Sequence, residues 1–403
     1  MSDKTRTRRP FRHVVRAPVV RFMELEASGG IAMLAAAIVA LLWANLLGDS
    51  YHDVWFRELS LFPGDLAVTL TWEEWVNDGL MAIFFFVVGL EVKRELISGE
   101  LSDRKAAALP VLAALGGMLV PALIYLMIGG GTESRGWGVP VATDIAFAVG
   151  VLTLLSKRVP ASLKIFLLTL AVADDIGGIV VIAAFYTDDL SVPWFALAVA
   201  SFVVVGGLRA SGVLSRVAYI LVALVAWYAM LRSGVHATIA GVVLGLMTPA
   251  EPVKGREVLA AIEERLQPWT SYAIVPLFAL ANAGVVVGGD ALGDAFTSPV
   301  AWGIILGLVV GKTVGISLAS WIAIRSGLAK LPTGATMHHI VGAAALGGIG
   351  FTVALFIANL AFEQPEHLDH AKIAILTASV VAGILGSAWL TLTARRTASK
   401  ADQ

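Results

Sequence analysis

Two adjacent acidic residues, Asp174 and Asp175, lie near the middle of the apolar run Leu168–Ile182. This stretch is long and hydrophobic enough to cross a bilayer, where one charged side chain costs at least about 2–3 kcal/mol. Two acids at such a depth predict a functional site. The alternative, that they only join neighbouring helices through hydrogen bonds, is the weaker interpretation for two successive aspartates.

These acids permit a hard cation and protons to compete for one site. Adjacent residues of a helix point about 100° apart, so one aspartate can face a cation while the other pairs elsewhere. Na⁺ or Li⁺ takes oxygen ligands, here carboxylates, the Thr143 hydroxyl and freed backbone carbonyls. Only deprotonated carboxylates bind the cation, so its binding releases protons. If two protons leave for each Na⁺, net charge crosses the membrane and the membrane potential can drive the exchange.

The composition predicts that the acids belong to a membrane protein with many spans. Mean hydropathy is +0.82 and only 15% of residues are charged, whereas soluble domains have about 25%. The 403 residues allow roughly a dozen spans of about 20 residues each. The chain has no cysteine, which excludes disulfides, thiolate metal sites and cysteine nucleophiles. Its basic start leads into an apolar segment near Ile31 that we expect to stay uncleaved.

Apolar runs separated by charged or Gly/Pro-rich breaks predict twelve spans. They are 28–47, 74–96, 107–128, 138–155, 165–186, 193–208, 213–230, 236–249, 269–287, 300–323, 338–361 and 371–391. With a cytoplasmic N-terminus, 24 of the 29 Lys and Arg residues fall on the inner side, which satisfies the positive-inside rule. We therefore expect a basic cytoplasmic tail at 1–22, one transmembrane domain at 23–392 and a cytoplasmic C-terminal tail at 393–403.

Two spans carry residues that interrupt a helix. Span four contains Pro140 and the acid Asp144, and span eleven contains three glycines within Gly347–Gly350. A helix broken inside a membrane is tolerated where it lines a cavity. Spans three to five and ten to twelve then become three-helix units of opposite topology, which is typical of inverted-repeat transporters with a midplane site. Lys312 is the one cation expected inside a span, where it could offset helix dipoles or pair with an aspartate.

Two loops carry their own signals. Val54–Phe62 and Leu66–Trp72 are rich in strand formers and flank Pro63–Asp65, which predicts an external hairpin, with an irregular loop as the alternative. The inner loop 250–268 is highly charged and favours a helix.

Further polar residues each have a structural alternative. Asp78 could line an outward funnel or be merely interfacial, and His236 is more typical of a helix interface than of a ligand. Glu91, Lys93, Arg94 and Glu95 predict a charge network at the inner surface, which could also be a solvated face.

Six motifs, taken together and in order, resemble the NhaA-type Na⁺/H⁺ antiporters. They are Gly89–Leu96, Ala142–Phe147, Ala173–Gly177, Ser233–Thr238, Phe278–Gly284 and Gly348–Thr352. The resemblance runs from about residue 20 to residue 392, with Lys312 in the corresponding place. Inverted repeats are already known in this family, so the repeat pattern is not independent support.

The resemblance implies a role for each candidate at the site. Asp175 and Asp174 would carry the cation and the protons, with Lys312 paired to Asp174. Thr143 and Asp144 would line the site where the broken spans cross. We expect Asp175 to be the indispensable cation ligand and Asp174 to be the acid whose protonation competes with its lysine pair.

The resemblance also implies a pathway, a pH response and a partner. The pathway and pH-response residues would be Asp78, Glu91, Arg94, Glu95, His236 and Glu263. The hairpin in 48–72 would mediate a homodimer in the bacterial inner membrane. Some family members carry histidines beside the leucine before Pro-Trp at the end of the inner loop, but Glu263–Trp269 has none. Because histidine is the natural titrator near neutrality, coupled glutamates would have to set the pH response.

The expected activity is electrogenic Na⁺(Li⁺)/H⁺ antiport, which serves pH homeostasis and salt tolerance and is not an enzyme reaction. No cofactor, nucleic acid or soluble partner is expected beside the lipid bilayer. A Na⁺-coupled solute symporter is the alternative, disfavoured because the site offers acids and no anion-binding arginine. An intramembrane aspartyl protease needs two acids facing each other from different helices, which Asp174 and Asp175 cannot do. A passive channel remains open at this point.

Overall fold

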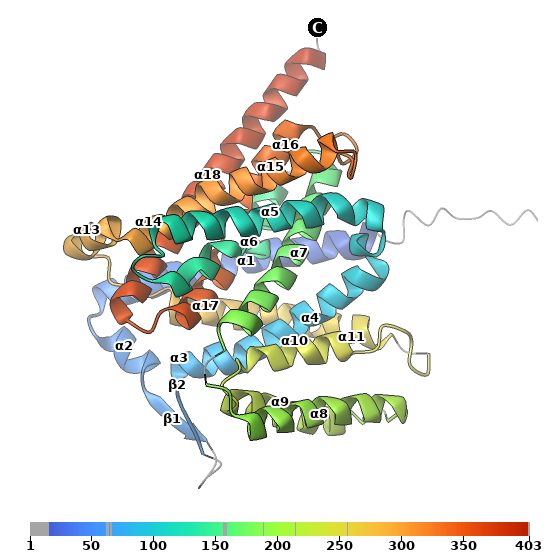
Figure 1. The fold of residues 1–403 in the computed structure, drawn as a ribbon, viewed down its shortest axis with the longest axis vertical. Helices are drawn as coiled ribbons and strands as arrows, with labels where there is room; N and C mark the ends of the chain where they lie inside the picture. The colour runs from blue at the N-terminus through green and yellow to red at the C-terminus, as the bar shows by residue number, and fades with distance from the viewer. Residues whose placement is uncertain are drawn as a thin grey trace, which may run out of the picture.

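The computed structural model describes residues 16–61, 64, 67–155, 159–187, 189–213, 215–255 and 257–401. Residues 1–15 of the predicted N-terminal tail lie outside this part, as do Pro63 and Asp65 of the predicted turn. The described chain is mainly helical, with one small sheet at its edge (Figure 1).

The first half of the chain alternates long helices with short irregular segments. Its elements are α1 (Arg16–Leu46), α2 (Ser50–Trp55), β1 (Glu58–Leu61), β2 (Val68–Thr71), α3 (Trp72–Glu74), η3 (Trp75–Leu80), α4 (Met81–Ser98), η4 (Glu100–Ser102), α5 (Arg104–Ile128), η5 (Ser134–Val141), α6 (Ile145–Leu154), α7 (Ala161–Phe185) and α8 (Val192–Ala210).

The second half repeats this alternation. Its elements are α9 (Arg216–Arg232), α10 (Thr238–Met247), α11 (Val258–Trp269), η6 (Thr270–Ile274), α12 (Val275–Asn282), α13 (Gly289–Thr297), α14 (Pro299–Leu306), η7 (Gly307–Gly311), α15 (Lys312–Arg325), α16 (Met337–Leu346), α17 (Phe351–Ala361) and α18 (Pro365–Ala401). Of these, α11 lies in the loop 250–268 that was expected to favour a helix.

Seven helical segments in the described part are long and apolar enough to cross a membrane, or up to eight if the bent pair α16–α17 counts as one span. They lie within or around predicted spans, for example Arg104–Ile128 around 107–128 and Ala161–Phe185 around 165–186. Large apolar side chains such as Leu119, Met127 and Val203 remain exposed, as lipid contact requires. The chain is therefore a polytopic membrane protein.

The segments around Pro140 and Gly347 depart from regular helix. The 3₁₀ segment η5 ends at Val141, and α6 begins only at Ile145. Between α16 and α17 the axis bends by 50°. A Cβ atom added at Gly348 would lie 2.5 Å from the carbonyl oxygen of Leu308, so the backbone of this bend approaches its neighbour more closely than a side chain would permit.

The two irregular segments meet through backbone and side-chain hydrogen bonds. The Asp144 amide donates to the Ile349 carbonyl at 2.7 Å, and the Thr143 hydroxyl donates to the Gly347 carbonyl at 2.8 Å. These bonds satisfy backbone groups that have no partner within a regular helix. Such groups need hydrogen-bond partners because their surroundings are apolar.

In the part of the chain that the structure describes, three short π-helical segments adjoin α-helices: η3, η6 and η7. Segments of this kind are rare and occur frequently at functional sites. Here η3 contains Asp78, η6 contributes Thr270 and Ser271 to the cavity described below, and η7 ends directly before Lys312.

The predicted hairpin is present but shorter than expected. Strands β1 and β2 pair antiparallel, with Glu58 opposite Thr71 and Leu61 opposite Val68. The prediction of a strand from Val54 was wrong, since 50–55 form helix α2. Helix α2 buries Tyr51 and Trp55, and the Tyr51 hydroxyl donates to the Leu280 carbonyl at 2.8 Å. This tertiary burial overrides the local preference for a strand.

The hairpin, α2 and α13 lie together at the left of Figure 1, and the loop that leads into α11 lies at the right. We refer to these two ends of the molecule as the hairpin side and the α11 side. Helices α4, α5, α7, α8 and α10 run between them (Figure 1).

Candidate functional site

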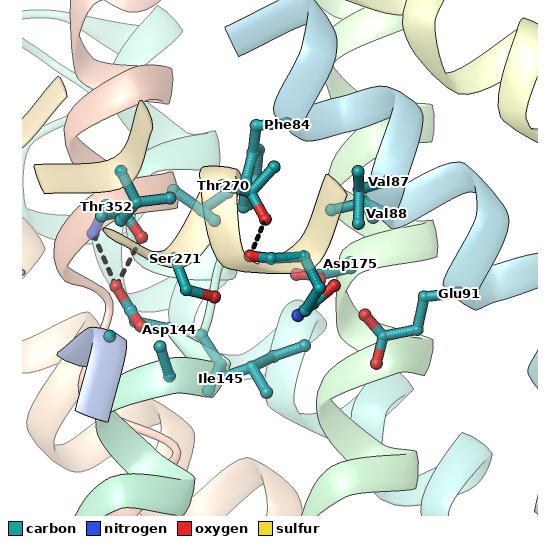
Figure 2. A pocket seen from close by; sticks show the side chains of 16 residues that line it. Phe84, Val87, Val88, Glu91, Asp144, Ile145, Asp175, Thr270, Ser271 and Thr352 are labelled. Atoms are coloured by element: carbon teal, nitrogen blue, oxygen red, sulfur yellow. Dashed lines mark hydrogen bonds between the residues drawn. The ribbon is translucent and has the colours of Figure 1, made fainter. Parts of the chain in front are cut away.

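A cavity lies among α4, α6, α7, η6 and α17. Its polar lining comprises Glu91, Thr143, Asp144, Asp175, Gln267, Thr270, Ser271 and Thr352, and its apolar wall includes Phe84, Val87 and Val88. Figure 2 shows the carboxylates of Asp175 and Glu91 on one side of this space, with Asp144 and Thr352 on the other. The presence of Gln267 and Thr270 in the lining places the cavity toward the α11 side.

The two adjacent aspartates of α7 have different surroundings. Asp175 is half-buried and lines the cavity. Asp174 is buried, and its Oδ2 accepts a hydrogen bond from Lys312 Nζ at 2.6 Å. Both side chains of this ion pair have no exposed surface. The roughly 100° between successive helical residues separates the two carboxylates, so only Asp175 is presented to the cavity.

Lys312 reaches Asp174 from helix α15, which contributes no residue to the cavity lining. It is the first residue of α15, directly after the π-helical segment η7. Helix α15 packs along α5, and α5 in turn packs against α7. A lysine with no exposed surface needs a counter-charge at close range, and the Asp174 carboxylate supplies it.

The carboxylate of Asp144 accepts hydrogen bonds at the N-termini of two helices. Its Oδ1 accepts from the Phe147 amide at 3.1 Å, in the first turn of α6. Its Oδ2 accepts from the Thr352 amide at 3.0 Å and from the Thr352 hydroxyl, in the first turn of α17 (Figure 2). An anion at a helix N-terminus interacts favourably with the helix dipole, and here one carboxylate serves two such ends.

Three predicted acids and one arginine form an ion-pair cluster on the α11 side. Arg94 Nη1 lies 2.6 Å from Glu263 Oε1, while Arg94 Nη2 lies 3.6 Å from Glu95 and 3.9 Å from Glu91. Glu91 also lines the cavity, so it joins the cluster to the site. Burial raises the pKa of Glu263, and the charge of Arg94 opposes that rise.

The remaining predicted residues lie outside the cavity lining. Asp78 is in η3, where its backbone carbonyl accepts from Trp227 Nε1 at 2.7 Å. His236 lies before α10, with its Nε2 at 2.5 Å from the Tyr186 carbonyl. Lys93 donates from Nζ to the Leu246 carbonyl at the end of α10, at 2.5 Å.

Sequence reasoning missed three hydroxyl residues of the cavity, Thr270, Ser271 and Thr352. Thr352 was visible only as part of the Gly348–Thr352 motif, with no role attached. Thr270 and Ser271 carried no signal, since they reach the cavity through the π-helical register of η6. Within the described residues, no group of three or more His, Cys, Asp or Glu side chains could hold a metal ion. The cavity lining presents carboxylate and hydroxyl side chains, whose oxygens are the ligand type that hard cations take.

Comparison with known proteins supplies the context for this geometry. The family model described as Na⁺/H⁺ antiporter 1 matches residues 20–390. A protein of Oleidesulfovibrio alaskensis named Na(+)/H(+) antiporter NhaA is 46% identical over 417 residues, covering 92% of each chain. Proteins of the same name from Shigella dysenteriae serotype 1 and Escherichia coli O157:H7 are each 48% identical over 376 residues, covering 92% of this chain and 97% of theirs.

Proposed function

Because this chain belongs to the NhaA-type Na⁺/H⁺ antiporter family, we propose that it is a secondary active transporter that extrudes Na⁺ or Li⁺ in exchange for protons. The observation that carries the proposal is the difference between the two aspartates: Asp175 lines the cavity, whereas Asp174 forms an ion pair with Lys312. The transported ions are substrates, and the proposal involves no cofactor and no enzyme reaction.

In this proposal the chain crosses the membrane twelve times. The spans are α1, α3–α4, η5–α6, α5, α7, α8, α9, α10, η6–α12, α14–α15, α16–α17 and α18. The units 104–185 and 299–401 are the inverted repeats, and their interrupted middle spans meet at Thr143 and Gly347. Both termini are cytoplasmic, so the α11 side is the inner side of the bacterial inner membrane and the hairpin side is the outer side.

Asp175 is the cation ligand in this mechanism. Its carboxylate faces a cavity that also presents the hydroxyls of Ser271 and Thr352. A hard cation is bound by the ionised carboxylate and by neutral oxygens, while a proton converts the same carboxylate to a poor ligand. Na⁺ and H⁺ thus exclude each other at Asp175, and exchange needs no separate coupling device.

Asp174 supplies the second proton. When Na⁺ is bound, Asp174 is ionised and paired with Lys312, as in the geometry described above. When Na⁺ leaves, Asp174 is protonated and the ion pair breaks, while Lys312 keeps its own proton. Two protons then move for each Na⁺, so the exchange carries net charge and responds to the membrane potential.

Asp144 holds the crossing together in both states. Each of its oxygens is engaged by a helix N-terminus, so its negative charge is neutralised locally and is not available as a full cation ligand. It therefore acts as a positioning residue that keeps Thr143 and Thr352 at the cavity.

The cluster around Arg94 controls access from the inner side. Glu91 belongs to both cluster and cavity, which gives a direct contact between proton uptake at the surface and the ion site. Because burial raises the pKa of Glu263, this carboxyl keeps its proton to a higher pH than an exposed glutamate does. The Arg94–Glu263 pair then forms as the pH rises, and exchange is activated without a histidine in Glu263–Trp269.

The external hairpin β1–β2 joins two protomers into a homodimer. Its strands are short, and in the described residues the sheet has two strands, so each strand has one edge that faces away from its partner.

Transport in everted membrane vesicles tests the proposal. Addition of Na⁺ to vesicles acidified by respiration should release protons with the unaltered chain and not with Asp175→Asn. Asp189→Asn makes the same chemical change at an exposed position after α7 and should leave exchange unchanged. Normal exchange by Asp175→Asn would show that the ion site lies elsewhere.

A further inference from the structure

Three asparagines from three separate elements meet on the outer side of the cavity. They are Asn77 in η3, Asn282 at the end of α12 and Asn359 in α17. Asn77 and Asn282 exchange two amide hydrogen bonds, at 3.2 and 2.8 Å. Asn359 Nδ2 donates to the same Asn282 Oδ1 at 2.8 Å. We call these three residues the asparagine cluster.

Asn282 is the centre of this cluster. It has no exposed surface, and its amide makes four hydrogen bonds, the fourth to the Phe278 carbonyl at 2.9 Å. A buried amide costs free energy unless its donors and acceptor are satisfied, so Asn282 depends on both partners.

A layer of aromatic rings lies between the cavity and the asparagine cluster. Phe356 of α17 contacts Phe85 of α4, with ring centroids 5.3 Å apart, and Phe278 of α12, at 6.3 Å. On α12 and α17 the chain leads from a cavity-lining residue to a phenylalanine and then, about one turn further, to an asparagine, whereas η3 and α4 run in the opposite direction, from Asn77 to Phe85 and then to the cavity-lining Val88. On α17 this order is Thr352, Phe356 and Asn359.

The three elements belong to differently packed parts of the molecule. Helix α12 packs against α1 and η3, whereas α17 packs chiefly against η5 and α18, within the two interrupted repeats. The hydrogen bond from Asn359 to Asn282 therefore crosses from the repeats to the surrounding helices. The Asn77–Asn282 pair lies wholly on the surrounding side.

From these contacts we infer that the asparagine cluster is a latch that closes the outward half of the ion path, with the Asn359–Asn282 bond as the part that must break when the site opens outward. The aromatic layer excludes water while the latch is closed. The hydrogen bonds between the asparagine amides fix the positions of the three elements relative to one another, because hydrogen bonds are directional and the contacts between phenylalanine rings are less so.

The role of the latch in transport rests on the proposed function. Its opening, however, can be measured without Na⁺ and without transport. The chain has no native cysteine, so one introduced thiol reports on accessibility. Ala279 has no exposed surface and lies one helical turn inward of Asn282. The reporter is Ala279→Cys, treated in intact cells with a membrane-impermeant maleimide.

We expect slow labelling of this reporter in the otherwise unaltered chain and roughly three- to tenfold faster labelling when Asn359→Ala is added, the effect of losing one hydrogen bond from the closed state. The matched control is Asn45→Ala. Asn45 is another outer-side asparagine, which bonds Leu41, Val285 and Val287 away from the aromatic layer. It should leave the labelling rate unchanged.

The latch is refuted if Asn359→Ala labels no faster than the unaltered background, or if Asn45→Ala accelerates labelling equally. A second experiment joins Asn282→Cys and Asn359→Cys with mercuric ion, with each single cysteine variant as control. Na⁺/H⁺ exchange should stop and should recover on addition of excess thiol. Continued exchange by the bridged protein would show that the path need not open at this point. If Asn359→Ala speeds labelling but the protein shows no Na⁺/H⁺ exchange, the latch stands and the proposed function is rejected.

Discussion

Replacing Lys312 by methionine tests the central ion pair most directly. The side chain keeps its approximate length and apolar stem, but Asp174 loses the ammonium group that lies 2.6 Å from its Oδ2. Both groups have no exposed surface, so solvent screening cannot make up the loss. Removing one partner of a buried ion pair costs about 3–5 kcal/mol. That cost corresponds to roughly two to four orders of magnitude in the folding equilibrium.

The matched variants are Asp174→Asn and the double replacement Lys312→Met with Asp174→Asn. A neutral pair of similar volume leaves no buried charge, and such replacements of whole ion pairs are often close to neutral in stability. We therefore expect Lys312→Met alone to unfold at a clearly lower temperature in detergent, and the double variant to recover most of the difference. Intrinsic tryptophan fluorescence of the 11 tryptophans reports the transition.

The double-mutant comparison has a definite refuting result. If Lys312→Met unfolds at the same temperature as the unaltered protein, the lysine does not compensate Asp174. If the double variant is as unstable as the single one, the loss comes from packing around Lys312 and not from an uncompensated carboxylate. Either result removes the electrostatic basis for a second proton at Asp174.

Three further perturbations follow from other parts of the structure. Glu263→Gln should displace the pH midpoint of exchange in vesicles by roughly one unit and flatten its rise, because burial raises the pKa of this carboxyl and its ionisation forms the pair with Arg94. The control is Glu251→Gln at an exposed position of the same loop, and an unchanged profile with Glu263→Gln would exclude the cluster from pH control. Gly241→Ala should lower the free energy of unfolding by about 1–3 kcal/mol, because the added Cβ overlaps a backbone carbonyl of α4. Gly207→Ala on α8 is the control, since its Cβ meets open space and should leave stability unchanged. Equal effects of the two changes would contradict close packing of α4 against α10. Deletion of residues 58–71 should convert dimers to monomers in light scattering, and persistent dimers would place the interface elsewhere.

Much of the fold follows from hydrophobicity along the chain. Runs such as 107–128 and 165–186 are apolar enough to require burial in lipid, and backbone hydrogen bonding in lipid leaves them no alternative to a helix. Helices α2 and α13, of 6 and 9 residues, were not predicted, because helices this short are set by tertiary contacts, such as the hydrogen bond from the Tyr51 hydroxyl to the Leu280 carbonyl. Strand propensity placed the hairpin but extended it into α2.

The acids of the cavity and Thr143 could be predicted, whereas the other hydroxyl residues of its lining could not. An aspartate in an apolar run stands out because of its solvation cost, whereas a threonine or serine in a helix costs little and gives no signal. Thr270 and Ser271 reach the cavity through a π-helical register, which depends on hydrogen-bond spacing and leaves no pattern in the residue types. The asparagine cluster was missed for a related reason, since Asn77 and Asn359 are 282 residues apart in the chain and gain meaning only in contact.

The shared carboxylate of Asp144 has a consequence for mutational tolerance. Asparagine would offer one oxygen and one amide group, so either Phe147 or Thr352 would face a second donor. Glutamate would carry both oxygens one methylene further from its backbone, which is itself fixed by the bond to Ile349. Position 144 therefore admits a single residue type, and a saturation library selected for growth on salt should return aspartate alone there. The hydrogen bonds that join the starts of α6 and α17 thus depend on this one side chain.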